Sequence, residues 1–110
     1  MSRRAPFGPT RDMSEAPRIS ATTVPRLKPG IRMQFNEARQ QWIVQAPERV
    51  LMPDEVAVAV LQRCDGTATV AAIAEALARQ YEAPPEVVTA DIVELLQDLA
   101  EKGIIADAGA

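Results

Sequence analysis

The chain has 110 residues, a formal net charge of −3, and hydrophobic and charged fractions of 47% and 25%, a composition typical of one small globular domain. No apolar run approaches the roughly 20 residues that cross a bilayer, and no apolar segment follows the N-terminal arginines, so a soluble cytoplasmic protein without a membrane partner is expected. The chain has one cysteine, Cys64, and no histidine, which offers no cysteine–histidine pair and a poor ligand set for zinc. We therefore expect no enzyme activity, no metal and no cofactor.

Residues 1–29 contain five prolines and show no helical or strand periodicity, which is typical of a disordered segment. They carry six cations and two anions, a net charge of +4, so that residues 30–110 carry −7. Residues 1–25 are expected to be a disordered tail or linker, and residues 26–110 are expected to form the domain. The alternative for the first segment is a basic arm that binds phosphates or an acidic partner, which its scattered arginines support only weakly.

Three short strands are predicted next. Residues 31–36 alternate between apolar and polar, as in a strand with one buried face. Residues 42–44 follow a polar loop and are aromatic and β-branched, which fits the second arm of an antiparallel hairpin. The third run, residues 49–52, lies between Pro47 and Pro53. Because proline cannot donate a hydrogen bond to a neighbouring strand, this run is expected at the edge of the sheet.

Three helices are predicted after the strands. The first begins at Pro53-Asp54-Glu55, where carboxylates favour a helix N-terminus, and ends at Asp65-Gly66, because glycine readily takes the left-handed conformation. The second begins after its N-cap, Thr69. The third begins at Pro84-Pro85 and ends at Gly103. The apolar positions of the first two helices are expected in the core, and they are Val56, Val60, Leu61, Cys64, Val70, Ile73, Ala74, Leu77 and Tyr81.

The third helix has more apolar surface than one packing layer requires, since its apolar arc covers nearly half of the circumference. Either the domain itself packs against the helix on two sides, or the helix forms the wall of a groove for a partner. Its other face is acidic. The apolar arc comprises Val88, Thr89, Ile92, Val93, Leu95, Leu96, Leu99 and Ala100, and the acidic face comprises Glu86, Asp91, Glu94, Asp98 and Glu101.

The expected fold is α+β and winged helix-turn-helix-like, with a three-stranded antiparallel sheet followed by three helices. In such domains that bind DNA, a helix enters the major groove. Here that helix is acidic and would repel phosphates, so a nucleic acid is not the expected partner and nucleic-acid binding is kept as the alternative function. A module that docks on another folded protein is a third possibility. An edge strand beside spare apolar helix surface favours binding a peptide as an added strand.

A set of short motifs along the chain has a characteristic order and spacing. The motifs are Trp42, Pro47-Glu48-Arg49, Cys64-Asp65-Gly66, Thr69-Val70-x-x-Ile73-x-x-x-Leu77-x-x-x-Tyr81 and Asp91-Ile92-x-x-x-Leu96-x-x-Leu99-x-x-x-Gly103. Over about residues 25–105 the chain resembles the PqqD family, the D proteins of pyrroloquinoline quinone (PQQ) biosynthesis. It departs from many members at Pro53-Asp54, where they have Leu-Asn, and at Ile104, where they often have tryptophan or leucine.

The resemblance implies a non-catalytic peptide chaperone, a recognition element for ribosomally made and modified peptides (RiPP recognition element). It implies binding of the precursor peptide PqqA and its presentation to the radical SAM enzyme PqqE. Some members are fused behind PqqC, which makes residues 1–25 a candidate linker remnant. In the family the peptide lies along the third strand and the third helix. The corresponding residues here are Arg49, Val50, Leu51 and Met52 on the strand, and Val88, Thr89, Ile92, Val93 and Leu96 on the helix.

Overall fold

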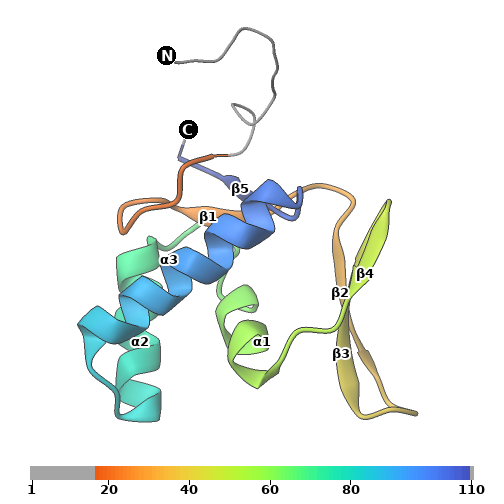
Figure 1. Cartoon of the computed structure of the whole chain (residues 1–110), viewed down its shortest axis with the longest axis horizontal. Helices are drawn as coiled ribbons and strands as arrows, with labels where there is room; N and C mark the ends of the chain where they lie inside the picture. The colour runs from red at the N-terminus through yellow and green to blue at the C-terminus, as the bar shows by residue number, and fades with distance from the viewer. Residues whose placement is uncertain (1–16, 110) are drawn as a thin grey trace, which may run out of the picture.

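The structure is a computed structural model that describes residues 17–109 (Figure 1). In this part of the chain, a sheet of order β2-β3-β4 is followed by three helices, and a separate pair of strands, β1 and β5, joins the two ends of the domain. The predicted fold is therefore confirmed, with one additional two-stranded sheet. The elements are β1 Pro25–Leu27, β2 Arg32–Asn36, β3 Gln41–Ala46, β4 Arg49–Leu51, α1 Glu55–Leu61, α2 Val70–Tyr81, α3 Pro85–Glu101 and β5 Ile105–Asp107.

The three-stranded sheet follows from the alternation in its sequence. Met33 pairs with Val44, and Phe35 pairs with Trp42, so the apolar residues of β2 and β3 share one face. Val44 is buried in the core, whereas Phe35 lies beyond it and is half exposed. The Phe35 and Trp42 rings pack edge to face, with centroids 5.5 Å apart and an interplanar angle of 64°. The hairpin thus extends past the core that anchors its other end.

The first two helices begin where the sequence predicted, α1 after Asp54 and α2 after the predicted N-cap Thr69. The Asp54 side chain accepts a hydrogen bond from the Ala57 amide at 2.8 Å, and Thr69 Oγ1 accepts one from the Ala72 amide at 3.1 Å. These bonds satisfy N–H groups that have no partner inside the helix. The first helix is shorter than predicted, because it ends at Leu61 and a tighter turn continues the chain.

Residues 17–27, which we call the N-terminal strap, cross the helical half of the domain. The sequence predicted a disordered tail or linker up to residue 25, but residues 17–25 are packed against the domain: Ile19 and Thr23 are buried, and Pro25–Leu27 form β1, paired antiparallel with β5. Sequence analysis missed this because single short strands carry no periodicity, and the partner strand lies about 80 residues away. The predicted tail at residues 1–16 lies outside the described residues.

The strap closes the junction between α1 and α2 through backbone hydrogen bonds. The Gly66 amide donates to the Pro25 carbonyl at 3.0 Å. Gly66 has a φ of +82°, and this turn brings the junction close to the strap. The Val70 amide donates to the Thr23 carbonyl at 2.8 Å, and the Ala71 amide donates to the Ala21 carbonyl at 2.9 Å. The first amides of α2 are therefore already paired within the domain.

Cys64 lies in the core, as predicted. Its side chain is buried, and its Sγ donates a hydrogen bond to the Val60 carbonyl oxygen at 3.3 Å. Burial raises the pKa of the thiol from 9.0 to about 12, and the neighbouring Asp65 charge adds to the rise. A thiol held protonated in this way is a small apolar side chain rather than a nucleophile.

The raised pKa of Cys64 predicts a loss of stability in alkali. Between the unfolded pKa near 9.0 and the folded pKa near 12, the unfolded chain binds fewer protons than the folded chain, so the free energy of unfolding falls by up to about 1.4 kcal/mol per pH unit. Urea unfolding at pH 8.0 and pH 10.5 measures this slope. The Cys64→Ala variant should be less stable at pH 8.0, through a small cavity, and should show a shallower decline. An equal decline in both proteins would contradict the assignment.

The described residues contain neither a helix long and apolar enough to cross a membrane nor a group of three or more side chains that could hold a metal ion.

Candidate functional site

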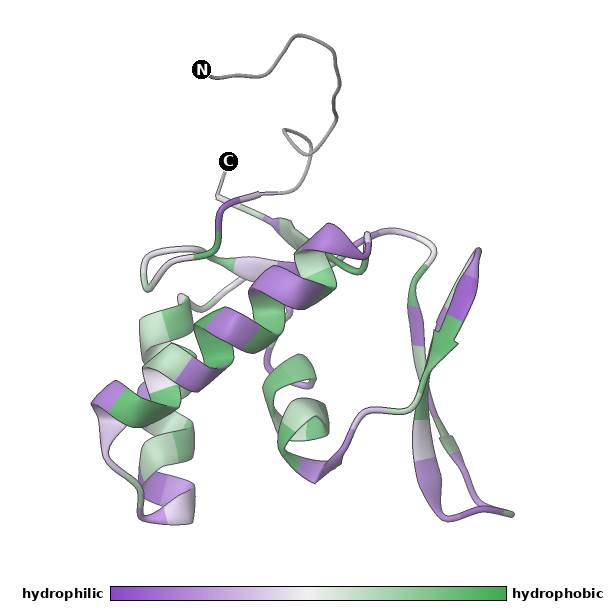
Figure 2. Cartoon of the chain, viewed as in Figure 1, coloured by the Kyte–Doolittle hydropathy of each residue, from purple (hydrophilic) through white to green (hydrophobic). Residues whose placement is uncertain are grey.

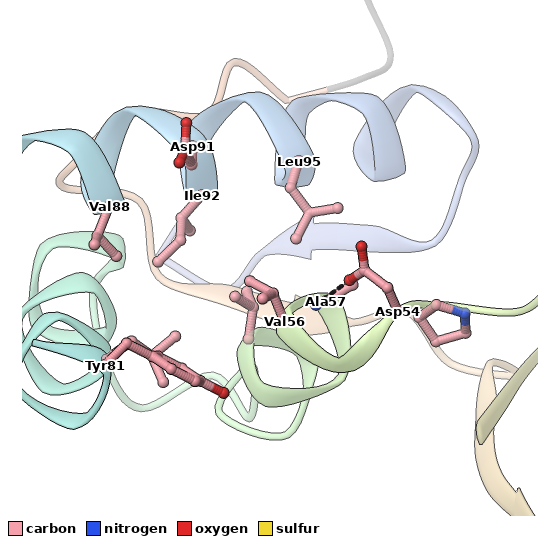
Figure 3. A pocket seen from close by; sticks show the side chains of 11 residues that line it. Asp54, Val56, Ala57, Tyr81, Val88, Asp91, Ile92 and Leu95 are labelled. Atoms are coloured by element: carbon pink, nitrogen blue, oxygen red, sulfur yellow. Dashed lines mark hydrogen bonds between the residues drawn. The ribbon is translucent and has the colours of Figure 1, made fainter. Parts of the chain in front are cut away.

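A groove lies between α1 and α3, with the last residue of α2 at one end (Figure 3). Its volume is about 490 Å³ and its lining is mostly apolar. Ile92 and Leu95 point from α3 toward α1, and Tyr81 reaches the groove from α2. A concave apolar surface of this size is the usual form of a ligand site. The lining residues are Pro53, Asp54, Val56, Ala57, Val60, Leu77, Tyr81, Val88, Asp91, Ile92 and Leu95.

Two large side chains of this groove are only partly covered. Val56, near the start of α1, is 54% exposed, and Tyr81, at the end of α2, is 41% exposed. Figure 2 shows α1 in hydrophobic colours along most of its length, because its sequence supplies apolar residues on more than its core side. Covering such surface is favourable by about 25 cal/mol per Å². A bound apolar side chain would therefore be stabilised here.

Two carboxylates accompany the apolar lining. Asp54 is fixed by its cap hydrogen bond to the Ala57 amide, and the Asp91 carboxylate points away from the groove floor (Figure 3). Within residues 17–109 the ion pair is Lys102–Asp98, at the C-terminal end of α3. Neither groove carboxylate is therefore neutralised by a cation of the described residues. The groove combines an apolar floor with a negative rim.

The outer edge of β4 is the second candidate surface. The two-residue turn between β3 and β4 makes Ala46 and Arg49 a hydrogen-bonded pair. Such pairs alternate along an antiparallel ladder, so Val44 and Leu51 are also hydrogen-bonded, whereas Val50 is not bonded to β3. The N–H and C=O of Val50 therefore face outward, and its side chain is 56% exposed. Among the described strands, β4 pairs only with β3, which leaves this edge open to an added strand.

The structure places the nine sequence-predicted site residues in three settings. Val88 and Ile92 line the groove. Arg49, Val50 and Met52 are exposed on and after β4, while Leu51 packs partly against the core. The other three residues of α3 lie outside the groove lining: Leu96 is fully buried, Val93 is partly buried against the core, and the Thr89 hydroxyl donates to the Pro85 carbonyl oxygen. Their role in binding stays a prediction.

Sequence analysis missed part of the groove wall. Val56 and Tyr81 were expected in the core, because helical periodicity identifies an apolar face but not what covers it. Leu95 belonged to the expected apolar arc of α3 but not to the predicted site. The chain continues from β4 through Met52 into Pro53, which lines the groove. One residue, Met52, therefore separates the end of β4 from the groove lining.

Comparisons with known proteins give a consistent result. The family model for coenzyme PQQ synthesis protein D (PqqD) matches residues 41–105. A protein of Rhodopseudomonas palustris (strain TIE-1) named "PqqA binding protein" is 50% identical over 90 residues, which cover 82% of this chain and 88% of the relative. A protein of the same name from Xanthomonas oryzae pv. oryzae (strain PXO99A) is 43% identical over 81 residues, covering 74% of this chain and 88% of that protein.

A solved structure agrees with these relatives. The solution NMR structure of the PqqD truncation of Methylobacterium extorquens PqqCD, which represents a functional and stand-alone RiPP recognition element, superposes with a TM-score of 0.71. It is 42% identical in sequence, and the match covers 80% of this chain and 94% of that structure. The match extends over most of the fold, and the family model covers more than half of the chain. This chain belongs to the PqqD family of PQQ biosynthesis proteins.

Proposed function

We propose that this protein is a non-catalytic peptide-binding protein whose ligand is the precursor peptide PqqA. The relatives named "PqqA binding protein" support this ligand, and the structural match to a RiPP recognition element supports a peptide. The buried, protonated Cys64 supports a role without nucleophilic catalysis. The observation that carries the proposal is the outward backbone of Val50 on an open strand edge, three residues before Pro53 of the apolar groove.

The peptide pairs with β4 by β-augmentation. One added strand would hydrogen-bond to the outward N–H and C=O of Val50, which gives affinity without reading the peptide's sequence. Arg49, directly before Val50, and Met52, two residues after it, are also exposed. Side chains on alternate positions of an added strand point to opposite faces. Specificity therefore comes from the protein side chains that contact each face of the added strand.

The groove between α1 and α3 receives apolar side chains of the peptide. Val88 and Ile92 come from α3, and Val56 comes from α1, so a side chain inserted here would contact two helices. Leu51, Val93 and Leu96 would support this surface by packing behind it. Thr89, whose hydroxyl donates to the Pro85 carbonyl, is proposed to contact the peptide directly. Binding would thus combine backbone pairing on β4 with apolar burial at the groove.

Presentation to the radical SAM enzyme PqqE completes the proposed role. A three-residue strand and one groove would hold only a short segment of the peptide. The rest of the peptide would stay accessible to a modifying enzyme. PqqC is a further proposed partner, by fusion or association, and the M. extorquens relative, a truncation of PqqCD, supports it.

The helix-turn-helix surface does not favour the alternative, nucleic-acid binding. Helix N-termini in such proteins often contact phosphates, but the first amides of α2, at Val70 and Ala71, donate to strap carbonyls. The outer face of α3 carries five acidic residues, which would repel a nucleic-acid backbone. Peptide affinity should change little with salt, whereas phosphate contacts would give a steep decline.

Two exposed valines provide a matched test of the groove. Val56 lines the groove and Val87 does not, yet both are 54% exposed and lie in the first turn of their helices. The Val56→Asp variant should bind PqqA about tenfold more weakly, because a charge would lie against apolar surface in the complex. The Val87→Asp variant should bind as the parent does.

Isothermal titration calorimetry with synthetic PqqA measures both affinities, and thermal unfolding confirms that both variants fold. Equal affinities of the two folded variants would contradict the groove assignment. Failure of the parent protein to bind PqqA would contradict the proposed function itself.

A further inference from the structure

We infer that a second cavity, between the β2–β3 hairpin and α1, binds a cationic side chain of the same peptide. This inference rests on the proposed function. The cavity has a volume of about 320 Å³ and lies on the other side of the α1 N-terminus from the groove. A larger share of its lining is polar than in the groove. The lining residues are Gln40, Gln41, Trp42, Pro53, Glu55 and Val58.

The chemistry of this cavity is suited to a guanidinium or ammonium group. Trp42 supplies the aromatic side chain with the strongest attraction for a cation over its face. The Phe35 ring packs beside the Trp42 ring, with centroids 5.5 Å apart. Glu55 supplies a carboxylate, which can accept charge-assisted hydrogen bonds from an arginine or lysine. Within residues 17–109, no cation forms an ion pair with Glu55.

The fixed polar groups add directional contacts. Gln40 and Gln41 have side-chain amide oxygens that can accept hydrogen bonds from a cation. Gln40 has a positive φ of 53°, and its Nε2 donates to the Glu37 carbonyl at 2.8 Å, so its amide group is oriented by the hairpin loop. Trp42, Glu55, Gln40 and Gln41 thus line one hollow.

Pro53 lines both cavities, so the two adjoin across the N-terminal end of α1. An α-helix is about 10 Å wide, and an extended peptide advances about 3.3 Å per residue. A peptide that places an apolar side chain in the groove would therefore reach the second cavity about three residues away. The expected recognition pattern is an apolar residue and a basic residue about three positions apart.

The single tryptophan makes this inference testable without the peptide. Trp42 gives the only indole N–H resonance of the chain, so its chemical shift reports on this cavity alone. The full chain is titrated with N-acetyl-argininamide, and with N-acetyl-citrullinamide, which has the same shape but no charge. The arginine compound should shift the resonance with at least about fivefold higher affinity.

Two charge variants complete the design. Glu55→Gln should abolish the preference for the arginine compound. The control variant is Glu75→Gln, which removes the same charge from an exposed position on α2. This control should retain the preference for the arginine compound. Equal responses to the two compounds, or an unchanged preference in Glu55→Gln, would overturn the inference.

The same comparison in the peptide separates this inference from the proposed function. For this test, any arginine or lysine of PqqA is replaced by citrulline. That peptide should bind the parent protein about fivefold more weakly than unmodified PqqA does. It should bind the Glu55→Gln variant no more weakly than unmodified PqqA does. If the citrulline peptide binds the parent as well as unmodified PqqA, the inference fails and the proposed function stands. If unmodified PqqA does not bind while the arginine compound does, the proposed function fails instead.

Discussion

The Val50→Pro variant should bind PqqA about 30-fold more weakly than the parent protein. Proline removes the outward N–H of Val50, and its ring occupies the position that an added strand would take. The bonds between β3 and β4 should persist, because the flanking residues Arg49 and Leu51 make them. An unpaired backbone group in a complex costs about 1–3 kcal/mol, which corresponds to the expected loss. Isothermal titration calorimetry measures the change.

The Val50→Ala variant is the matched control, because it removes the same exposed side chain and keeps the N–H. It should bind within about threefold of the parent. Proline is tolerated on edge strands when its N–H position faces solvent, so Val50→Pro should unfold at nearly the parent temperature. A folded Val50→Pro variant with parental affinity would show that the peptide does not pair with β4.

A chain of residues 26–110 should be less stable than a chain of residues 17–110 by about 4 kcal/mol. The shorter chain lacks Ile19 and Thr23, which are buried, and loses the carbonyls that pair with the amides of Val70 and Ala71. Removing one large buried apolar side chain alone costs about 2–5 kcal/mol. That loss is a large fraction of the 5–15 kcal/mol that stabilises a typical domain.

Urea unfolding of the two chains at equal pH and salt measures this difference. The Gln97→Ala variant of the longer chain gives an intermediate control, because the Gln97 amide group accepts from the Ile19 amide at 2.9 Å and donates to the Pro17 carbonyl at 3.1 Å. It should lose about 1–2 kcal/mol. Equal stability of the two chains would place the domain boundary near residue 26, as the composition had predicted.

The sequence predicted the elements whose signals are local. Thr69 was predicted as an N-cap, and Asp54 lies in the predicted start of the first helix. Both side chains accept a hydrogen bond from an amide of the first turn. The hairpins follow from alternation and from prolines that limit the strands. The acidic face of α3 follows from helical spacing alone, and its residues Glu86, Asp91, Glu94, Asp98 and Glu101 are all exposed.

Features that depend on distant contacts were not predictable. The strap is held by partners in α2, α3 and β5, and nothing in its own composition reveals them. Val56 is exposed whereas Val60, one turn later in α1, is buried. This difference depends on how α1 is placed relative to α3. Periodicity predicted an apolar face, but tertiary packing decided which part of that face stays open.

The antiparallel pairing of β1 and β5 has a consequence for how the domain can be joined to other proteins. Pro25 lies opposite Asp107, so the chain enters and leaves the fold at neighbouring points (Figure 1). β4 belongs to the other sheet. A domain attached before the strap or after β5 would therefore lie near the β1–β5 pair. The β4 edge would stay accessible. This geometry would allow the domain to be joined to another protein at either end.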